Sequence, residues 1–166
     1  MRAQRLIDPG PGFGYPGDVN PLTCAPLHSR SPEQTLAAGK RLGERLAAQF
    51  PEGMLVLLIG PLGAGKTVMA KGIARGLGIR EPIISPTYTI ISEYHSGTTS
   101  LHHVDLYRIE GRDQMENLGL QDILAGTGFV VVEWGEKLQA GGAHVRVTLS
   151  LAADGGRDIL LEEAPA

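Results

Sequence analysis

The chain has 166 residues, 42% of them hydrophobic, and a formal net charge of −3, values typical of one folded domain with a tail. The slightly acidic balance argues against a protein that grips nucleic acid through a basic face of its own. Cys24 is the only cysteine, which excludes an intrachain disulfide and a cysteine metal cluster. No apolar run is long enough to cross a membrane and residues 1–8 lack the hydrophobic stretch of a signal peptide, so we expect a soluble cytoplasmic protein.

The first residues of the chain differ in composition from the rest. Residues 1–25 are dense in proline and glycine, most of all at residues 9–17, and carry almost no periodic apolar pattern. Such a segment buries too little apolar surface to fold by itself. We therefore predict a disordered extension over residues 1–25, one folded domain over residues 26–162 and a tail over residues 163–166.

The first regular elements predicted are a short strand near residues 25–29 and an amphipathic helix over residues 32–49. Ser31 is the expected N-cap of the helix, with Pro32 in the first helical position and Gln34 three residues after the cap. The apolar residues on one face of this helix are Leu36, Leu42, Leu46 and Phe50.

The most informative segment of the chain follows this helix. A short apolar strand at Leu55–Ile59 leads into Gly60–Thr67, which has the pattern G-x-x-x-x-G-K-T, and a helical pattern runs on from Val68 to Leu77. This is a phosphate-binding loop in its required context of strand, glycine-rich turn and helix start. Its backbone N–H groups and the helix N-terminus would cradle phosphate, Lys66 would reach the β- and γ-phosphates, and Thr67 would ligate magnesium. The alternative, a glycine-rich turn that binds nothing, is disfavoured because every motif position is matched.

The remaining elements complete an α/β pattern. A loop at residues 85–88 enters a predicted hairpin over residues 89–107, and short helices are expected within residues 111–126. A buried strand then ends at Glu133, and a last hairpin joins residues 144–151 to residues 158–161. The pattern predicts a P-loop NTPase fold, with a mixed, mostly parallel sheet flanked by helices and carrying β-hairpins.

A phosphate-binding loop needs a carboxylate to hold magnesium, and two acids follow apolar strands. Glu133 follows Phe129–Val132, so it is expected at the carboxyl end of a parallel strand, where ligands of open α/β sheets collect. Asp105 ends a strand that alternates and is less plainly buried. Either acid alone would more often be a solvated strand end or a salt-bridge partner, but the phosphate-binding loop makes both candidates.

Three histidines and one tryptophan are weaker signals. His102 and His103 are expected on opposite faces of their strand, which disfavours chelation by that pair. With His95 they are interpreted as ordinary strand histidines. Trp134, the only tryptophan, adjoins Glu133 and by itself would be packing.

Five segments of the chain, taken together, carry a more specific signal: Gly60–Thr67, Ser85–Thr89, His103–Arg108, Glu116–Leu120 and Val132–Trp134. In this order and spacing they closely resemble the TsaE (YjeE) family of bacterial ATPases, which take part in making threonylcarbamoyladenosine in tRNA. The resemblance covers about residues 31–160 and leaves residues 1–28 outside it.

This resemblance implies that ATP and Mg²⁺ are bound. It gives phosphate and magnesium contacts to Lys66 and Thr67, the second protein ligand of the metal to Glu133, and another essential acid to Asp105. It makes Ser85–Thr89 a switch-like loop near the γ-phosphate, puts Arg157 at the nucleotide and puts the adenine side near Ser31. The nucleotide contacts so expected are Ser31, Gly60, Leu62, Gly63, Ala64, Gly65, Lys66, Thr67, Thr87, Trp134 and Arg157. The expected catalytic residues are Lys66, Asp105 and Glu133, and the expected metal ligands are Thr67, Glu133 and Asp105.

Two positions depart from the family pattern. Pro61 stands where an aspartate is usual, and Val68 stands where a second threonine is usual. Neither change removes a phosphate- or magnesium-binding group, so we expect nucleotide binding to survive and the catalytic rate to be more affected.

The function that the resemblance implies is a weak ATPase that binds and resets a complex of a TsaD-type transferase and a TsaB-type companion, with tRNA reached only through that complex. Two other classes stay open. A nucleotide-dependent binding switch would bind ATP with negligible turnover. A small-molecule kinase would need a second substrate pocket and an arginine-bearing lid, whereas residues 108–126 hold only Arg108 and Arg112.

Overall fold

The computed structural model describes residues 24–164. The elements in chain order are β1 (Cys24–Ser29), α1 (Pro32–Gln49), β2 (Leu55–Ile59), α2 (Lys66–Gly76), β3 (Ile91–Ser96), β4 (Thr99–Asp105), α3 (Arg112–Glu116), α4 (Leu120–Ala125), β5 (Phe129–Glu133), the 3₁₀ turn η1 (Gly135–Lys137), β6 (His144–Leu151) and β7 (Arg157–Ala164). Within these residues no helix is long and apolar enough to cross a bilayer.

In the described part of the chain, the strands form one seven-stranded sheet in the order β1-β7-β6-β2-β5-β4-β3. The pairs β6–β2, β2–β5 and β5–β4 are parallel, and the pairs toward the two edges are antiparallel. The predicted mixed sheet and both hairpins are thus confirmed, with the parallel part confined to the centre. Because β2, β5 and β4 run in parallel, their carboxyl ends meet at one edge of the sheet.

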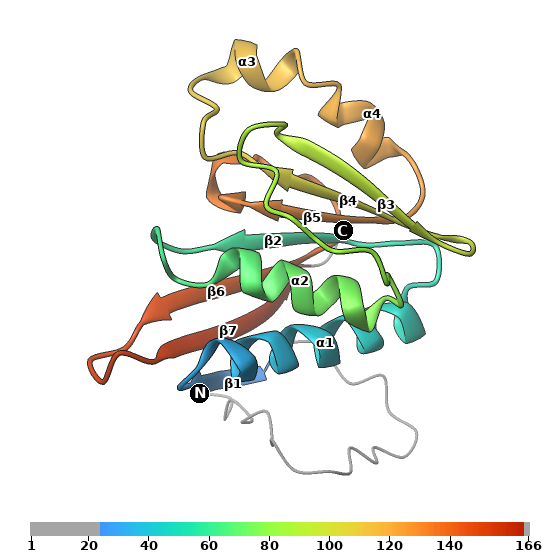
Figure 1. Ribbon diagram of the computed structural model, residues 1–166. Coiled ribbons are helices and arrows are strands. Elements are labelled where there is room, and N and C mark those ends of the chain that lie inside the picture. The colour runs from blue at the N-terminus through green and yellow to red at the C-terminus, as the bar shows by residue number, and fades with distance from the viewer. Residues whose placement is uncertain (1–23, 165–166) are drawn as a thin grey trace.

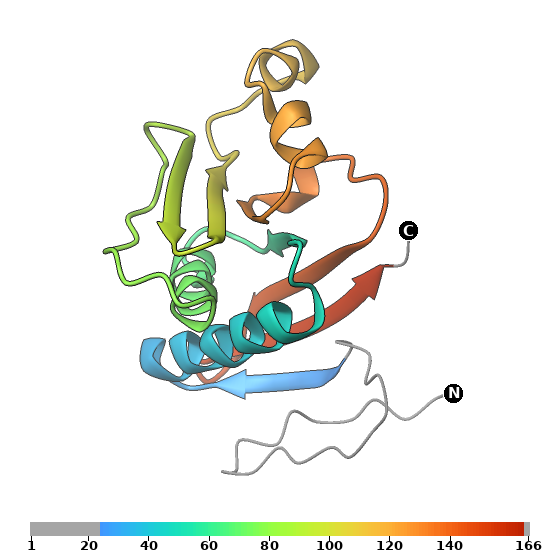
Figure 2. The same ribbon diagram turned by 90° about the vertical axis from the view of Figure 1, so that its right-hand side faces the viewer.

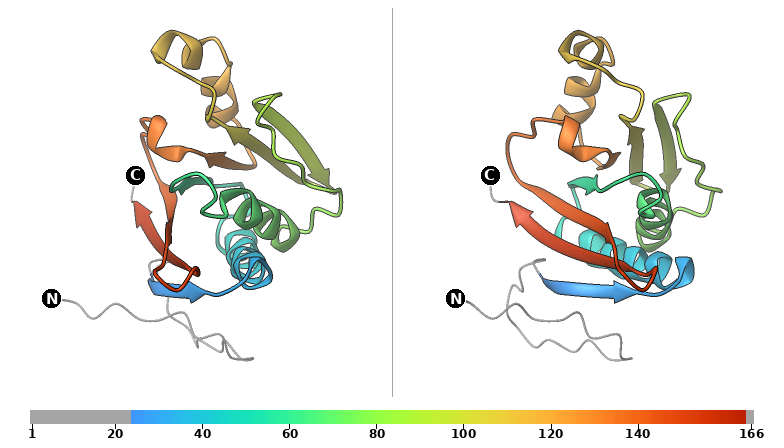
Figure 3. Two further views of the ribbon diagram at one scale, coloured as in Figure 1. Left: turned by 60° about the vertical axis from the view of Figure 1, so that its left-hand side comes forward. Right: turned by 90° about the vertical axis from the view of Figure 1, so that its left-hand side faces the viewer.

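Each face of the sheet is covered by different helices. Figure 1 shows α1 and α2 lying across one face, where they pack on Val56, Leu58 and Val131. Residues of the opposite pleat, among them Leu57, Val130 and Val132, pack with residues from α3 and α4 on the other face. Figures 2 and 3 show α3 and α4 grouped near β4, far from β1. Strand β5 is buried on both faces, which explains its uninterrupted apolar run.

Helices α1 and α2 approach each other through glycines. A Cβ at Gly39 or Gly43 of α1 would overlap the carbonyl oxygen of Met69 or Ile73 in α2. Gly72 and Gly76 of α2 meet the backbone of α1 in the same way. The two helix backbones are therefore in direct contact, which fixes α1 firmly against the helix that begins at the phosphate-binding loop.

The element boundaries match the sequence prediction closely, with small differences at the ends. Helix α1 has the predicted bounds, and Ser31 caps it by accepting the Gln34 N–H at 3.3 Å. Helix α2 starts at Lys66, two residues before the predicted start, because the glycine-rich turn closes directly into the helix. Strand β7 runs to Ala164, so residues 163 and 164 belong to the sheet and not to the predicted tail. The extension predicted over residues 1–25 lies outside the described residues, except that Cys24 and Ala25 begin β1.

Candidate nucleotide site

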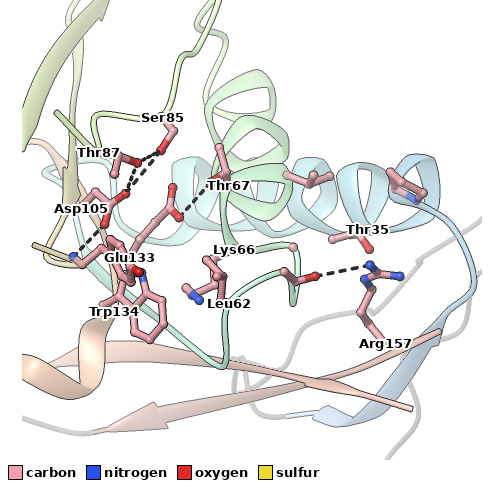
Figure 4. A pocket seen from close by; sticks show the side chains of 15 residues that line it. Thr35, Leu62, Lys66, Thr67, Ser85, Thr87, Asp105, Glu133, Trp134 and Arg157 are labelled. Atoms are coloured by element: carbon pink, nitrogen blue, oxygen red, sulfur yellow. Dashed lines mark hydrogen bonds between the residues drawn. The ribbon is translucent and has the colours of Figure 1, made fainter. Parts of the chain in front are cut away.

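The candidate site is a cavity of about 370 Å³ at the carboxyl edge of the parallel strands. The loop between β2 and α2 forms its floor, with Gly65 as the N-cap of α2 at φ 98°, a left-handed conformation that glycine adopts without strain. A Cβ at Gly60 would overlap the carbonyl oxygen of Leu149, so this position also requires glycine. In Figure 4 the side chains form two groups, with acids and hydroxyls on one side of the loop and Thr35 and Arg157 on the other.

Lys66 is held inside the loop that carries it. Its Nζ donates to the carbonyl oxygens of Gly60 at 2.6 Å and Pro61 at 2.9 Å, and it lies 3.8 Å from the centroid of the Trp134 ring. The side chain is only 5% exposed. Burial lowers the pKa of the ammonium, while the negative charges of Glu133, Glu136 and Asp105 oppose that shift. The site therefore holds a poorly solvated cation whose hydrogen bonds to the loop carbonyls an anionic ligand could replace.

Thr67 and Glu133 form an oxygen pair at the start of α2. The Thr67 hydroxyl donates to Oε2 of Glu133 at 2.9 Å, and both residues line the cavity. The pair arises because β5 lies beside β2, so the acid at the end of β5 faces the first turn of α2. Mg²⁺ prefers oxygen ligands and is usually held by one or two protein groups together with phosphate. The hydroxyl and carboxylate present here therefore fit a magnesium site, and they are two of the three predicted metal ligands, Asp105 being the third.

Asp105 has different partners. Its Oδ2 accepts from the Thr87 hydroxyl at 2.8 Å and from the Ser85 hydroxyl at 3.3 Å, and its Oδ1 accepts the Tyr107 N–H at 2.9 Å. The carboxylate is 3% exposed, although the sequence suggested a less buried strand. Asp105 thus ties the Ser85–Thr89 loop to the end of β4, beside Glu133, its direct neighbour in the sheet register.

The same loop ends in an unusual backbone conformation. Ile90 has φ 67°, a left-handed value that is a genuine outlier for a β-branched residue. Its N–H donates to the carbonyl of Pro86 at 2.6 Å, and its carbonyl accepts the Asp105 N–H at 2.9 Å. The loop is therefore fixed to β4 both through backbone bonds at Ile90 and through the Asp105 side chain.

Arg157 reaches the site from the first position of β7, directly after the turn that joins β6 to β7. Its guanidinium donates to the carbonyl of Gly155 at 3.0 Å and to that of Gly63, in the phosphate-binding loop, at 3.4 Å. His28 on β1 braces this turn, because its Nδ1 and Nε2 lie 2.8 Å and 2.9 Å from carboxylate oxygens of Asp158 and Asp154. These hydrogen bonds raise the pKa of His28, with the bond to Asp158 as the largest cause.

The structure does not bring every predicted nucleotide contact to the cavity wall. Ser31 does not line the cavity, because its hydroxyl accepts the Gln34 N–H, whereas Pro32 and Thr35 do line it. Gly60 and Ala64 also lie behind the lining, Ala64 fully buried, and shape the loop from within. The predicted residues that line the cavity are Leu62, Gly63, Gly65, Lys66, Thr67, Thr87, Asp105, Glu133, Trp134 and Arg157.

Most of the chain is similar to the proteins of one family. The family model described as "Threonylcarbamoyl adenosine biosynthesis protein TsaE" matches residues 29–159. This chain belongs to the TsaE family. It is 43% identical over 133 residues to the tRNA threonylcarbamoyladenosine biosynthesis protein TsaE of Treponema pallidum (strain Nichols), covering 79% of this chain and 95% of that one. The protein of the same name in Bacillus subtilis (strain 168) is 41% identical over 132 residues, covering 78% and 79%.

A solved structure agrees with the TsaE assignment at the level of the fold. The crystal structure of Bacillus subtilis YdiB superposes with a TM-score of 0.68 and 33% sequence identity, and the match covers 85% of each chain. The TsaE model match includes the phosphate-binding loop, both acids and Arg157, and begins at Ser29, the last residue of β1.

Sequence reasoning missed one buried contact of Glu133. His103 is interpreted from the sequence as an ordinary strand histidine and not as a metal ligand, and the structure adds that its Nε2 lies 2.8 Å from Oε1 of Glu133. His102, by contrast, points to the other side of the strand and lies 3.4 Å from Glu93. The signal that could have identified His103 is its alternation with Asp105, which places both side chains on one face of β4. Among the described residues, no group of three or more histidine, cysteine or acidic residues could hold a metal ion.

Proposed function

We propose that this chain is a magnesium-dependent ATPase that acts in making threonylcarbamoyladenosine in tRNA, where it binds and resets a complex of a TsaD-type transferase and a TsaB-type companion. One observation carries the proposal: the phosphate-binding loop places Lys66 and the Thr67–Glu133 pair in a single cavity. Membership of the TsaE family supports the pathway.

Each group of the site has a part in this reaction. Phosphate oxygens would replace the carbonyls of Gly60 and Pro61 as partners of Lys66, and the loop N–H groups would donate to them. Thr67 and Glu133 would hold a magnesium ion, whose positive charge would offset the charge of the phosphates. Lys66 would stabilise the charge that develops on the γ-phosphate in the transition state.

The attacking water needs a further group to orient it. Asp105 and the Thr87–Tyr88 loop are the two candidates, and the hydrogen bond between Thr87 and Asp105 makes them one unit. A change in this loop would therefore move the orienting group together with the rim of the cavity.

The surroundings of the cavity support a partner-dependent enzyme. Leu62, Ile84, Tyr88 and Tyr107 are large apolar residues that are 46–84% exposed, and all lie in or beside the loops that form the cavity. Among the described residues lining the cavity, Arg157 is the only arginine, and it is bound to two backbone carbonyls. In other nucleotide hydrolases an arginine finger raises the rate roughly 10³–10⁵-fold. Because no free arginine of this kind lines the cavity in the described residues, we expect slow turnover by the chain alone.

The test is phosphate release from Mg-ATP by the purified chain, alone and with TsaD- and TsaB-type proteins, with Lys66→Ala as the inactive control. We expect slow release alone, acceleration by the partners, and no release by Lys66→Ala, whose fold is set by glycines and not by the lysine. Fast turnover by the chain alone would contradict partner activation, and normal turnover by Lys66→Ala would contradict the site. Binding without release under all conditions would instead favour the nucleotide switch, and phosphate on a small acceptor would favour a kinase.

A further inference from the structure

His103 is a buried titratable residue to which the mechanism above gives no part. It lies on β4 two residues before Asp105, and its side chain is 1% exposed. Its ring nitrogen Nε2 lies 2.8 Å from Oε1 of Glu133, which is itself 3% exposed. The bond crosses between neighbouring parallel strands, where His103 pairs with Val131 and Asp105 pairs with Glu133.

The direction of this hydrogen bond follows from the chemistry of its two groups. The Glu133 carboxylate already accepts from Thr67 through Oε2, and its other oxygen accepts as well, so Nε2 of His103 is the donor. The second ring nitrogen, Nδ1, has no hydrogen-bond partner among the described residues. The bond to Glu133 is thus the one polar interaction shown for this ring.

The two carboxylate oxygens of Glu133 have different hydrogen-bond partners. Oε1 is held by His103 from inside the sheet, and Oε2 faces Thr67 in the cavity. Without a partner at Oε1, the carboxylate could rotate about its last torsion, which is broad and weakly restricted. With the partner in place, Oε2 stays on the side where a metal would bind.

We propose that His103 is a positioning residue that acts through Glu133 and fixes the carboxylate for magnesium. This inference rests on the proposed magnesium-dependent binding of nucleotide. Hydrogen-bond partners behind metal ligands commonly contribute 10- to 100-fold in metal affinity or activity, so an effect of that size is expected for His103.

The experiment compares His103→Met, which fills the space but has no donor, with His103→Gln, whose amide N–H extends to about the place of Nε2. The measurement is the Mg²⁺ concentration needed to tighten ATP binding, followed by calorimetry, with ATP binding in EDTA as reference. His103→Met is expected to need about 10- to 100-fold more Mg²⁺, while its ATP affinity in EDTA stays the same. His103→Gln is expected to restore most of the Mg²⁺ dependence, and His102→Gln, on the opposite face of the strand, serves as the matched control with no change.

The same substitution in a Glu133→Gln variant distinguishes a positioning role of His103 from a packing role. In Glu133→Gln, the substitution His103→Met is expected to have no additional effect on Mg²⁺ dependence, because the group through which His103 acts is already lost. Where His103→Met does not fold, His103→Asn takes its place, since its shorter side chain puts the amide near the Nδ1 position and away from Glu133.

The outcomes for the proposed function and for His103 are distinct. Absence of Mg²⁺-dependent nucleotide binding in the unmodified chain would overturn both the proposed function and the role of His103. Normal Mg²⁺ dependence in the unmodified chain and in His103→Met would overturn the role of His103 alone. Loss of thermal stability in His103→Met with unchanged Mg²⁺ dependence would likewise show that the residue only packs.

Discussion

Trp134 occupies a central position among the residues of the site. Its backbone is left-handed, with φ 60°, directly after the strand that ends in Glu133. This turn of the backbone lays the indole over Lys66, 3.8 Å from Nζ, and beside the Tyr107 ring at a centroid distance of 5.2 Å. Any ligand that draws Lys66 away from its loop carbonyls must also change the surroundings of the indole.

We therefore predict that Mg-ATP shifts the intensity or wavelength of Trp134 fluorescence. The signal is unmixed, because Trp134 is the only tryptophan of the chain. Glu133→Ala should reduce the shift and its magnesium dependence together, since it removes one of the two groups, Thr67 and Glu133, that we propose hold the metal. Compared with Glu133→Ala, Asp105→Ala should lower magnesium affinity less and turnover more, because Asp105 binds the loop hydroxyls. An unresponsive Trp134 in a protein that calorimetry shows to bind ATP would contradict the site geometry.

At the scale of elements, the contact of α1 with α2 depends on four glycines. The Cβ that alanine would add at Gly43 has no room, because the atom it meets is a backbone oxygen, that of Ile73, and not the end of a flexible side chain. Helix propensity alone would favour alanine over glycine by about 1 kcal/mol. Overpacking costs typically about 1–3 kcal/mol. Because a backbone oxygen cannot move aside, we take the upper part of that range, about 2–3 kcal/mol, which outweighs the gain.

Gly43→Ala is therefore expected to lower the free energy of unfolding by about 1–2 kcal/mol, the overpacking cost less the propensity gain. Urea denaturation measures this change. The matched control is Gly141→Ala, where a Cβ would meet nothing within 4 Å, and where the expected change is within about 0.5 kcal/mol. Equal stability of the two variants would contradict the close helix contact.

The brace between β1 and the β6–β7 turn is the second prediction at this scale. His28 lies between Asp154 and Asp158, so its pKa is raised above its ordinary value near 6.5. The pKa of Asp154 is lowered, chiefly by the Gly156 N–H and then by His28, so this carboxylate stays charged where His28 protonates. A group with a raised pKa in the folded state contributes stability that is present below the unfolded pKa and is lost as pH rises through the folded pKa.

The stability advantage of the unmodified chain over His28→Gln is thus expected to be largest near pH 6 and to fall toward about pH 8.5. Thermal unfolding at the two pH values measures it, and added salt should shrink it because the three side chains are exposed. A constant difference between the two proteins at both pH values would rule out a charged brace.

At the scale of the whole molecule, local sequence patterns were enough for the elements and for part of the site. The cap at Ser31, the loop at Gly60–Thr67 and the acid at the end of an apolar strand each depend on residues close in sequence, and each is found where predicted. Alternation along β4 indicates that His103 and Asp105 share a face, but the contact of His103 with Glu133 could not be predicted in this way, because it depends on the register of β4 against β5. That register joins segments far apart in the chain.

The helix contact was missed for a different reason. From the sequence alone, a glycine inside a helix is only a residue of low helix propensity. The close approach of the second helix explains the four glycines Gly39, Gly43, Gly72 and Gly76. The predicted adenine side near Ser31 illustrates the same limit. The pattern located the helix start, but the side chain is used by its own cap, and Pro32 and Thr35 line the cavity instead.

The backbone contact between α1 and α2 also has a consequence for protein engineering. Replacing helical glycine with alanine is a standard route to heat-resistant variants, because it restricts the unfolded chain and strengthens the helix. In this chain a library ranked by helix propensity would place Gly39, Gly43, Gly72 and Gly76 among its first choices, and each would collide with backbone. A heat-resistant form is better sought at exposed glycines where a Cβ meets nothing and the backbone is not left-handed, such as Gly141.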